Sequence, residues 1–191
     1  MSRPVAEELS AYVPHGAAET TDLPRIREVA AAAADPWSRS IPLHLTGSAV
    51  IVHPGSGQVL LRWHERQQAW LQVGGHGDPG ESDPLQIALR EAREETGLTD
   101  LVPWPDATLV HAIIVSVPAG GGEPAHEHAD LRYLLATSDP AAARPERETA
   151  PLRWLSLDDA RAVVAEDNLR ETLDRVAERM RVAGPAPADR A

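Results

Sequence analysis

The chain has 191 residues, 42% of them hydrophobic, which suffices for one sizeable apolar core and is too short for two. It contains no cysteine and no lysine, which excludes thiol nucleophiles, cysteine-ligated zinc, Schiff-base lysines and phosphate-loop lysines. The formal net charge of −11 argues against binding to polymeric nucleic acid, but small phosphate ligands remain compatible if cations mediate the contact.

The first twelve residues lack an apolar segment of signal-peptide length, and no stretch approaches the roughly 20 apolar residues needed to span a bilayer. We therefore expect a cytoplasmic protein that does not bind membranes. The preference for Ala, Arg, Gly and Pro over Lys and Phe is typical of a GC-rich bacterial genome.

The chain divides into three parts. Residues 1–40 are Ala-rich and polar, and we interpret them as a helical N-terminal arm. Residues 41–183 predict one α/β domain with a mixed β-sheet that includes a C-terminal helix, and residues 184–191 predict a disordered tail. Short β-branched runs bounded by Gly and Pro predict strands at residues 43–54, 58–64, 69–75, 107–117, 129–137 and from 152. Helical spacing covers residues 158–180 without a predicted break.

A further helix is predicted from residue 84. Asp83 is a suitable N-cap, Pro84 suits the first helical position, and Gly97 is well placed to end the helix. A stripe of small and apolar residues at helical spacing is expected to pack against the core: Leu85, Ala88, Leu89, Ala92 and Thr96.

The same helix carries Glu91, Glu94 and Glu95, whose spacing places the three carboxylates along one flank. One interpretation is a solvated acidic face, eased by Arg90 four residues before Glu94. The other is a site for a hard cation such as Mg²⁺, which prefers oxygen ligands and shares them with substrate phosphates. The spacing alone is compatible with both.

The residues from Gly75 to Leu98 decide between these interpretations, because they resemble the signature sequence of the Nudix hydrolase family. The residues that match this signature in order are Gly75, Glu81, Arg90, Glu91, Glu94, Glu95, Gly97 and Leu98. The chain has eight residues between Glu81 and Arg90 where the signature has seven, and it has Ala92 where the signature has a bulky aliphatic residue. The extra residue falls before the helix, so it concerns Glu81 more than the helical acids.

The resemblance implies a Nudix-like α/β/α sandwich that hydrolyses a nucleoside diphosphate linked to another moiety. It implies Mg²⁺ as cofactor, with Mn²⁺ as a substitute, bound by Glu91, Glu94, Glu95 and the backbone carbonyl of Gly75. Arg90 would orient the carboxylates, and Glu94 or Glu95 would hold the attacking water. The alternatives are a ligand-sensing module without turnover and, more distantly, a non-haem metal oxygenase. We expect a small nucleotide as partner, with a homodimer as the candidate assembly.

A second group of polar residues lies near residue 130. In an extended segment His126, His128, Asp130 and Arg132 share one face. This face is a solvated strand surface, a phosphate-binding or proton-transferring surface, or an iron or zinc triad made of the two histidines and a carboxylate. His76, beside Gly75, and Arg62, on a strand before the signature, are further candidates for substrate binding. Trp63 and Trp70 are expected to pack in the core, with base stacking as the alternative.

Overall fold

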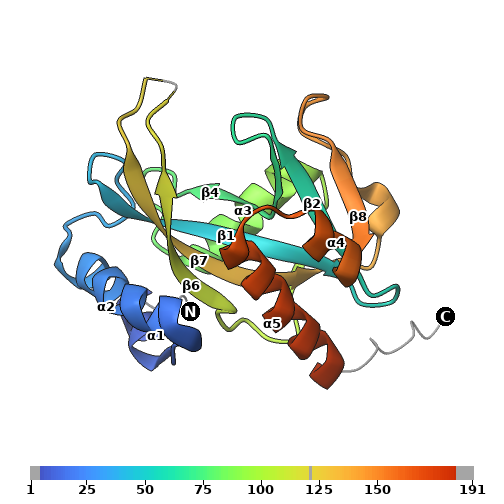
Figure 1. Ribbon diagram of the computed structural model, residues 1–191, viewed down its shortest axis with the longest axis horizontal. Coiled ribbons are helices and arrows are strands. Elements are labelled where there is room, and N and C mark those ends of the chain that lie inside the picture. Colours follow the sequence, from blue (N-terminus) through green and yellow to red (C-terminus); the bar gives the residue numbers. More distant parts are fainter. Residues whose placement is uncertain (1–4, 121, 184–191) are drawn as a thin grey trace.

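The computed structural model describes residues 5–120 and 122–183, and the tail predicted to be disordered lies outside this range. The helices are α1 (Val5–Ala11), α2 (Gly16–Ala32), α3 (Pro84–Thr96), α4 (Leu157–Val163) and α5 (Asp167–Ala183), with a short 3₁₀ helix at Pro140–Ala142. The strands are β1 (Leu43–His53), β2 (Gln58–His64), β3 (Ala69–Leu71), β4 (Val73–His76), β5 (Val102–Pro103), β6 (His111–Val117), β7 (His126–Ala136) and β8 (Leu152–Ser156). Figure 1 shows them as one curled sheet flanked by helices.

The sheet is mixed, as predicted. Its centre is the parallel pair of β1 and β7, which runs from Leu43 opposite Glu127 to Val52 opposite Ala136. On its other edge β1 divides between two antiparallel partners, since residues 46–49 pair with β4 and residues 51–53 pair with β2. Strand β2 continues the sheet to β3 and β8, and β6 and β5 pair with β7.

Two apolar cores lie on opposite faces of this sheet, because successive side chains of a strand point to opposite sides. Along β1, Leu45, Ala49 and Ile51 enter a core shared with α1, α2 and α3. Val50 and Val52 enter a second core shared with α4 and α5. The prediction of helices on both faces of a mixed sheet is therefore confirmed.

Helix α3 begins and ends where the sequence predicts. The Asp83 side chain accepts hydrogen bonds from the backbone N–H groups of Leu85 and Gln86, and Gly97 adopts a left-handed conformation with φ of 68°. The predicted apolar stripe is incomplete, because Ile87 is fully buried whereas Leu85 is only partly buried.

Two predicted elements are divided in the structure. The segment 69–75 breaks at Gln72, because β3 pairs with β2 whereas β4 pairs with β1. The helical segment 158–180 breaks at residues 164–166, between α4 and α5. The buried Val164 anchors this break in the second core, so the two helices leave it in different directions (Figure 1).

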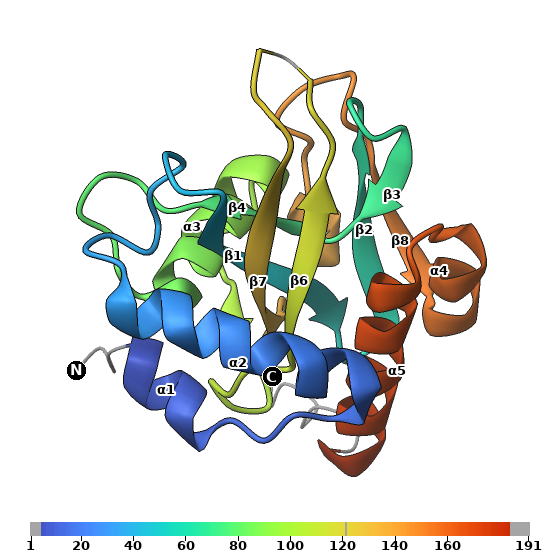
Figure 2. The ribbon, with the colours of Figure 1, turned by 60° about the vertical axis from the view of Figure 1, so that its left-hand side comes forward.

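Helices α1 and α2 precede the sheet, and α2 lies against β6 (Figure 2). Two carboxylates of α2 accept hydrogen bonds from the backbone of β6. The N–H of Ala112 donates to Glu19 at 2.9 Å, and the N–H of Ile114 donates to Asp22 at 2.9 Å. These bonds satisfy donors that an edge strand would otherwise expose. The fully buried Glu19 also forms an ion pair of 2.9 Å with Arg175 of α5.

A helix that crosses a membrane must be both long and apolar, and none of the helices in the described residues meets both conditions.

Candidate active site

Glu91 lies directly over the Gly74–Gly75 segment of β4. A Cβ atom placed on Gly75 would come within 2.7 Å of the Glu91 carboxylate, so glycine is required for this close approach. The Glu91 side chain is only 17% exposed. Burial, as the largest cause, raises its pKa above the usual value, although Arg90 opposes the shift.

Glu95, one turn further along α3, is also nearly buried. Its carboxylate accepts a hydrogen bond from the backbone N–H of Gly74 at 3.1 Å and pairs with Arg62 of β2 at 3.1 Å. Burial raises the pKa of Glu95 to about 7 despite both of these stabilising contacts. The site therefore holds two carboxylates whose negative charge is incompletely balanced by protein groups.

Arg90 joins the loop before α3 to the helix. Its guanidinium forms a bidentate pair with Glu81, with hydrogen bonds of 2.9 to 3.2 Å. It also binds Glu91 at 3.0 Å, Glu94 at 3.2 Å and the backbone carbonyl of His76 at 2.8 Å. Arg90 thus contacts two of the three helical glutamates, whereas Glu95 pairs with Arg62. The extra residue before α3 leaves Glu81 in contact with Arg90.

The three glutamates do not share one environment. The Glu94 side chain is 57% exposed, whereas those of Glu91 and Glu95 face β4 and are largely buried. The 100° rotation between successive helical residues explains this difference, because Glu91 and Glu95 differ by only about 40° around the axis. The prediction of one common flank is therefore right for Glu91 and Glu95 and approximate for Glu94.

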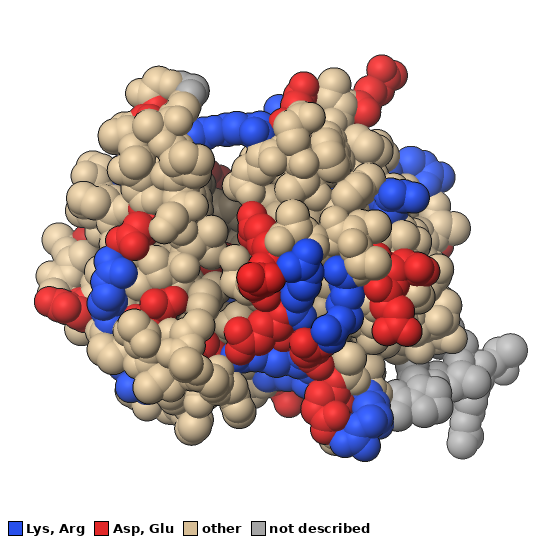
Figure 3. All heavy atoms as spheres, viewed as in Figure 1, with Lys and Arg blue, Asp and Glu red and all other residues tan. Residues whose placement is uncertain are grey.

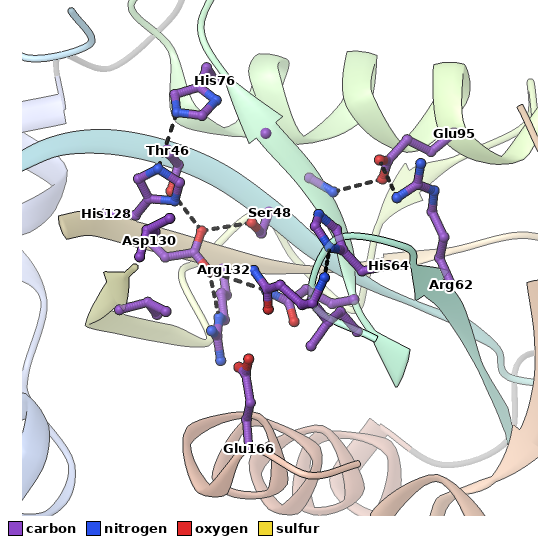
Figure 4. Close-up of a pocket in the computed structure, with 17 residues that line it drawn as sticks. Thr46, Ser48, Arg62, His64, His76, Glu95, His128, Asp130, Arg132 and Glu166 are labelled. Carbon is purple, nitrogen blue, oxygen red and sulfur yellow. Dashed lines mark hydrogen bonds and ion pairs between the residues drawn. The ribbon is translucent and has the colours of Figure 1, made fainter. Parts of the chain in front are cut away.

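A cavity of about 220 Å³ lies beside Glu95, between β1, β2, β4 and β7 (Figure 4). Four of the predicted substrate-binding residues line it: Arg62, His76, His128 and Arg132. The fifth predicted residue, His126, instead lines a neighbouring cavity of about 260 Å³. Glu95 and Gly75 border the first cavity, so candidate substrate groups and candidate metal ligands meet in one place.

Arg132 and Asp130 form the floor of this cavity. Asp130 pairs with Arg132 at 2.7 Å and accepts hydrogen bonds from the hydroxyls of Thr46 and Ser48. Figure 4 shows these side chains on the far side of the cavity from Glu95, with Glu166 pointing toward them from just before α5. Asp130 is therefore engaged by neighbours on β1 and β7.

The structure brings two other histidines to His126 and His128. His44 of β1 and His76 of β4 lie against them, and His44, His76 and His128 each offer a ring nitrogen within 4.8 Å of those of the other two. Burial, with the neighbouring imidazoles, lowers the pKa of His76 to about 3 and that of His128 to about 4. Among the described residues this cluster consists of three histidines, whereas the triad considered from the sequence combined His126, His128 and a carboxylate.

Sequence reasoning did not identify several residues at the site. Glu146, in the loop before β8, lies 3.5 Å from Arg62, and its backbone N–H binds the carbonyl of Glu95 at 3.3 Å. Gln72 donates to Asp130 at 3.2 Å. No spacing signal marks these residues, because they reach the site through strand pairing and loop packing. The tryptophans do not line the cavity: Trp63 and Trp70 pack edge to face at 5.4 Å, with Arg153 over Trp70.

The donor set suits a hard divalent cation. Carboxylates of α3 and the backbone of β4 supply only oxygen ligands, which Mg²⁺ and Mn²⁺ prefer. The close contact of Glu91 with Gly75 brings the two expected sources of ligands together. The buried and incompletely neutralised carboxylates of Glu91 and Glu95 also fit a bound cation.

Comparison with known proteins identifies the family. The profile of the NUDIX domain matches residues 43–179, which is most of the chain. The chain belongs to the Nudix family. The matched region begins at β1 and ends in α5, so helices α1 and α2 lie outside it. A comparison with curated protein sequences gave no match.

Solved structures share the Nudix fold. A NUDIX-family hydrolase from Clostridium perfringens is 25% identical, over 74% of this chain and 98% of its own, with a TM-score of 0.56. An Ap4A hydrolase from C. elegans is 22% identical, over 70% of this chain and 96% of its own, with a TM-score of 0.55. The E. coli dihydroneopterin triphosphate pyrophosphohydrolase is 20% identical, over 69% of this chain and 92% of its own, with a TM-score of 0.51.

Proposed function

We propose that this Nudix protein is a metal-dependent hydrolase that cleaves a pyrophosphate bond in a nucleoside diphosphate linked to another moiety. Water attacks phosphorus, and Mg²⁺ is the cofactor, with Mn²⁺ as a substitute. The observation that carries the proposal is the pair of nearly buried carboxylates, Glu91 and Glu95, held against Gly74 and Gly75, with Glu95 at the border of a cavity.

In this proposal Glu91, Glu94, Glu95 and the carbonyl of Gly75 hold the cation. A bound divalent cation neutralises phosphate oxygens and lowers the pKa of bound water. Glu94 or Glu95 accepts the proton of the attacking water. The Arg90 guanidinium is a positioning group, because its contacts to Glu81 and the carbonyl of His76 fix its orientation toward Glu91 and Glu94.

The first cavity is the proposed substrate site. Arg62 and Arg132 supply positive charge on opposite sides of it, and His128 of β7 lies at its border. Two buried polar atoms without a partner in the described residues, Arg62 Nε and Gln72 Oε1, belong to its lining residues. A phosphate or sugar group could satisfy them, since unpaired buried polar atoms are energetically unfavourable.

The surface is consistent with a small substrate. On the face shown in Figure 3 acidic and basic side chains are interspersed, and the face is hollowed between the β6–β7 and β2–β3 hairpins. Arg66 of the β2–β3 turn spans this hollow to the carbonyls of Pro118 and Gly120. Together with the net charge of −11, this pattern disfavours a polymeric nucleic acid.

The test is a screen of purified protein against dinucleoside polyphosphates, nucleoside triphosphates and nucleoside diphosphate sugars, with Mg²⁺ or Mn²⁺. Products are separated by chromatography, and reaction in ¹⁸O-labelled water reports which phosphorus is attacked. We expect label in a phosphate product and no turnover in EDTA. Binding of a nucleotide without turnover under all conditions would instead support the ligand-sensing alternative.

A further inference from the structure

Four imidazoles meet beside the glutamate site, on three different strands. His44 comes from β1, His76 from β4, and His126 and His128 from β7. The Nε2 atom of His76 lies 3.1 Å from that of His44 and 3.2 Å from that of His128, and the Nε2 atoms of His128 and His126 lie 3.1 Å apart. Strand pairing places these residues together, since His44 is opposite His128 in the parallel β1–β7 register.

The outer nitrogens of two rings are anchored by the backbone. The Nδ1 atom of His44 lies 3.0 Å from the carbonyl oxygen of Ile41, and the Nδ1 atom of His126 lies 2.9 Å from that of Pro124. A carbonyl oxygen only accepts hydrogen bonds, so Nδ1 carries the proton in both rings and each ring presents its Nε2 lone pair to the centre of the group. Metal-binding histidines commonly show this arrangement, with the outer N–H bound to a carbonyl.

Hydrogen bonds among the rings cannot account for the whole group. Each Nε2 atom has one position, which carries either a proton or a lone pair, and so forms one well-directed hydrogen bond. Four such atoms make at most two hydrogen bonds, yet three Nε2–Nε2 contacts of 3.1 to 3.2 Å are present. At least one contact therefore joins two nitrogens at close range without a proton suitably placed between them.

We propose that His44, His76 and His128 bind one transition-metal ion of the Zn²⁺ class, with His126 at the open side of the site. Nitrogens about 2.0–2.1 Å from a tetrahedral zinc ion lie about 3.3 Å from one another, close to the distances between these Nε2 atoms. The group offers imidazole ligands without a carboxylate or thiolate, and imidazole suits Zn²⁺, Cu²⁺ and Ni²⁺ better than Mg²⁺.

This histidine site is chemically distinct from the glutamate site, although the two are neighbours. Gly75 and His76 are adjacent, and Arg90 binds the carbonyl of His76 while it contacts Glu91. The second cavity, lined by His44, His76 and His126, gives an ion a route to the group that does not pass between the glutamates. A metal here would tie β1, β4 and β7 together at the border of the first cavity.

The experiment uses full-length protein stripped with a chelator and titrated with ZnCl₂ by calorimetry, and with CoCl₂ by absorption spectroscopy. We expect one Zn²⁺ per chain to bind in excess Mg²⁺, and Co²⁺ to give the visible bands of a tetrahedral nitrogen site. His128→Ala and His44→Ala should reduce Zn²⁺ affinity at least 100-fold, and His126→Ala should reduce it less. His53→Ala, at the end of β1, is the matched control and should bind as the wild type does.

Because His44 is buried, circular dichroism must first show that each variant is folded. The partly exposed His126→Ala variant, together with an anomalous-scattering map of zinc-soaked crystals, keeps the test decisive if His44→Ala does not fold. Zinc density centred between the Nε2 atoms would support the proposal. Unchanged Zn²⁺ affinity in folded His128→Ala, or loss of that binding in Glu91→Gln, would overturn it. Neither measurement depends on turnover, so failure here is separable from failure of the proposed hydrolase function.

Discussion

Arg62 of β2 and Glu95 of α3 form an ion pair with an Nη1–Oε1 distance of 3.1 Å, and their side chains are only 11% and 13% exposed. This ion pair links β2, at the border of the first cavity, to α3, which carries the three glutamates. Even so, burial raises the pKa of Glu95 to about 7, so one arginine does not offset the cost of removing this carboxylate from water. The metal-free site is therefore expected to be electrostatically unfavourable for folding.

The first prediction concerns the pH dependence of stability without metal. The pKa of Glu95 is higher in the folded state than its ordinary value of 4.5, so its contribution to stability is present below about pH 4.5 and is lost as pH rises through 7. In EDTA, Glu95→Gln should therefore become more stable relative to the wild type between pH 5 and 8, by up to about 3 kcal/mol. Thermal unfolding across this range measures the effect. A difference independent of pH would contradict it.

The second prediction concerns turnover. Glu91→Gln and Glu95→Gln retain the shape and hydrogen-bonding oxygen of the side chain but lose its charge, so each should lower turnover by about 10²–10⁴-fold. The control is Glu178→Gln, an exposed glutamate of α5 that pairs with Arg181. Initial rates at saturating Mg²⁺ and substrate give the comparison. Wild-type rates in both site variants would remove the acids from the mechanism.

The third prediction concerns metal linkage. A cation that binds only the native state stabilises it by mass action, so Mg²⁺ at about 100 times its Kd should add roughly 2.7 kcal/mol to the free energy of unfolding. Denaturant titrations with Mg²⁺ or EDTA measure this increase. It should disappear in the double variant Glu91→Gln, Glu95→Gln and persist in Glu178→Gln. An equal increase in all three proteins would indicate nonspecific ion effects.

The fourth prediction concerns the close approach at β4. In Gly75→Ala the new Cβ atom would lie 2.7 Å from the Glu91 carboxylate, which must move away. Because a flexible side-chain end can move, the protein should stay folded while Mg²⁺ affinity falls about 10–100-fold. Gly55→Ala, in the β1–β2 turn, is the control. Calorimetric Mg²⁺ titration of both variants tests this expectation, which fails if Gly75→Ala binds Mg²⁺ like the wild type.

The fifth prediction concerns Glu19 of α2, which binds the backbone of β6 and Arg175 of α5. Although burial alone would raise the pKa of Glu19, hydrogen bonds from Arg175, Ala112 and Tyr12 lower it below 4.5. Its stabilisation is therefore present above pH 4.5 and lost as pH falls below that value. Glu19→Gln leaves Arg175 without its buried partner and should cost about 3–5 kcal/mol at pH 7.

Thermal unfolding measured at neutral and at acidic pH tests the prediction for Glu19→Gln, with Glu178→Gln as the control. Thermal unfolding of Glu19→Gln should show a large loss at pH 7 that shrinks as the pH falls below 4.5 and wild-type Glu19 itself becomes protonated. Glu178→Gln, at an exposed pair, should change stability far less at either pH. A Glu19→Gln variant as stable as the wild type at pH 7 would show that α2 is held by its apolar contacts alone.

The sequence by itself determined the local features of this protein. Asp83, Pro84 and Gly97 fix the ends of α3 through capping and backbone geometry, and the spacing from Gly75 to Leu98 identifies the family, because these signals depend on residues close together in the chain. Short β-branched runs bounded by Gly and Pro similarly predicted β1 and β2. The break at Gln72 was not predictable, because it arises from a change of strand partner.

Only the tertiary structure decided which distant residues meet. The pairing of Arg62 with Glu95, the position of Glu146, and the meeting of His44 with His76 depend on strand register and loop packing across long sequence separations. The burial that raises the pKa of Glu95 is likewise a property of the packed site, since the same glutamate in an isolated helix would be solvated. Local spacing placed the three acids on one helix, and the packing of that helix against β4 made two of them different from the third.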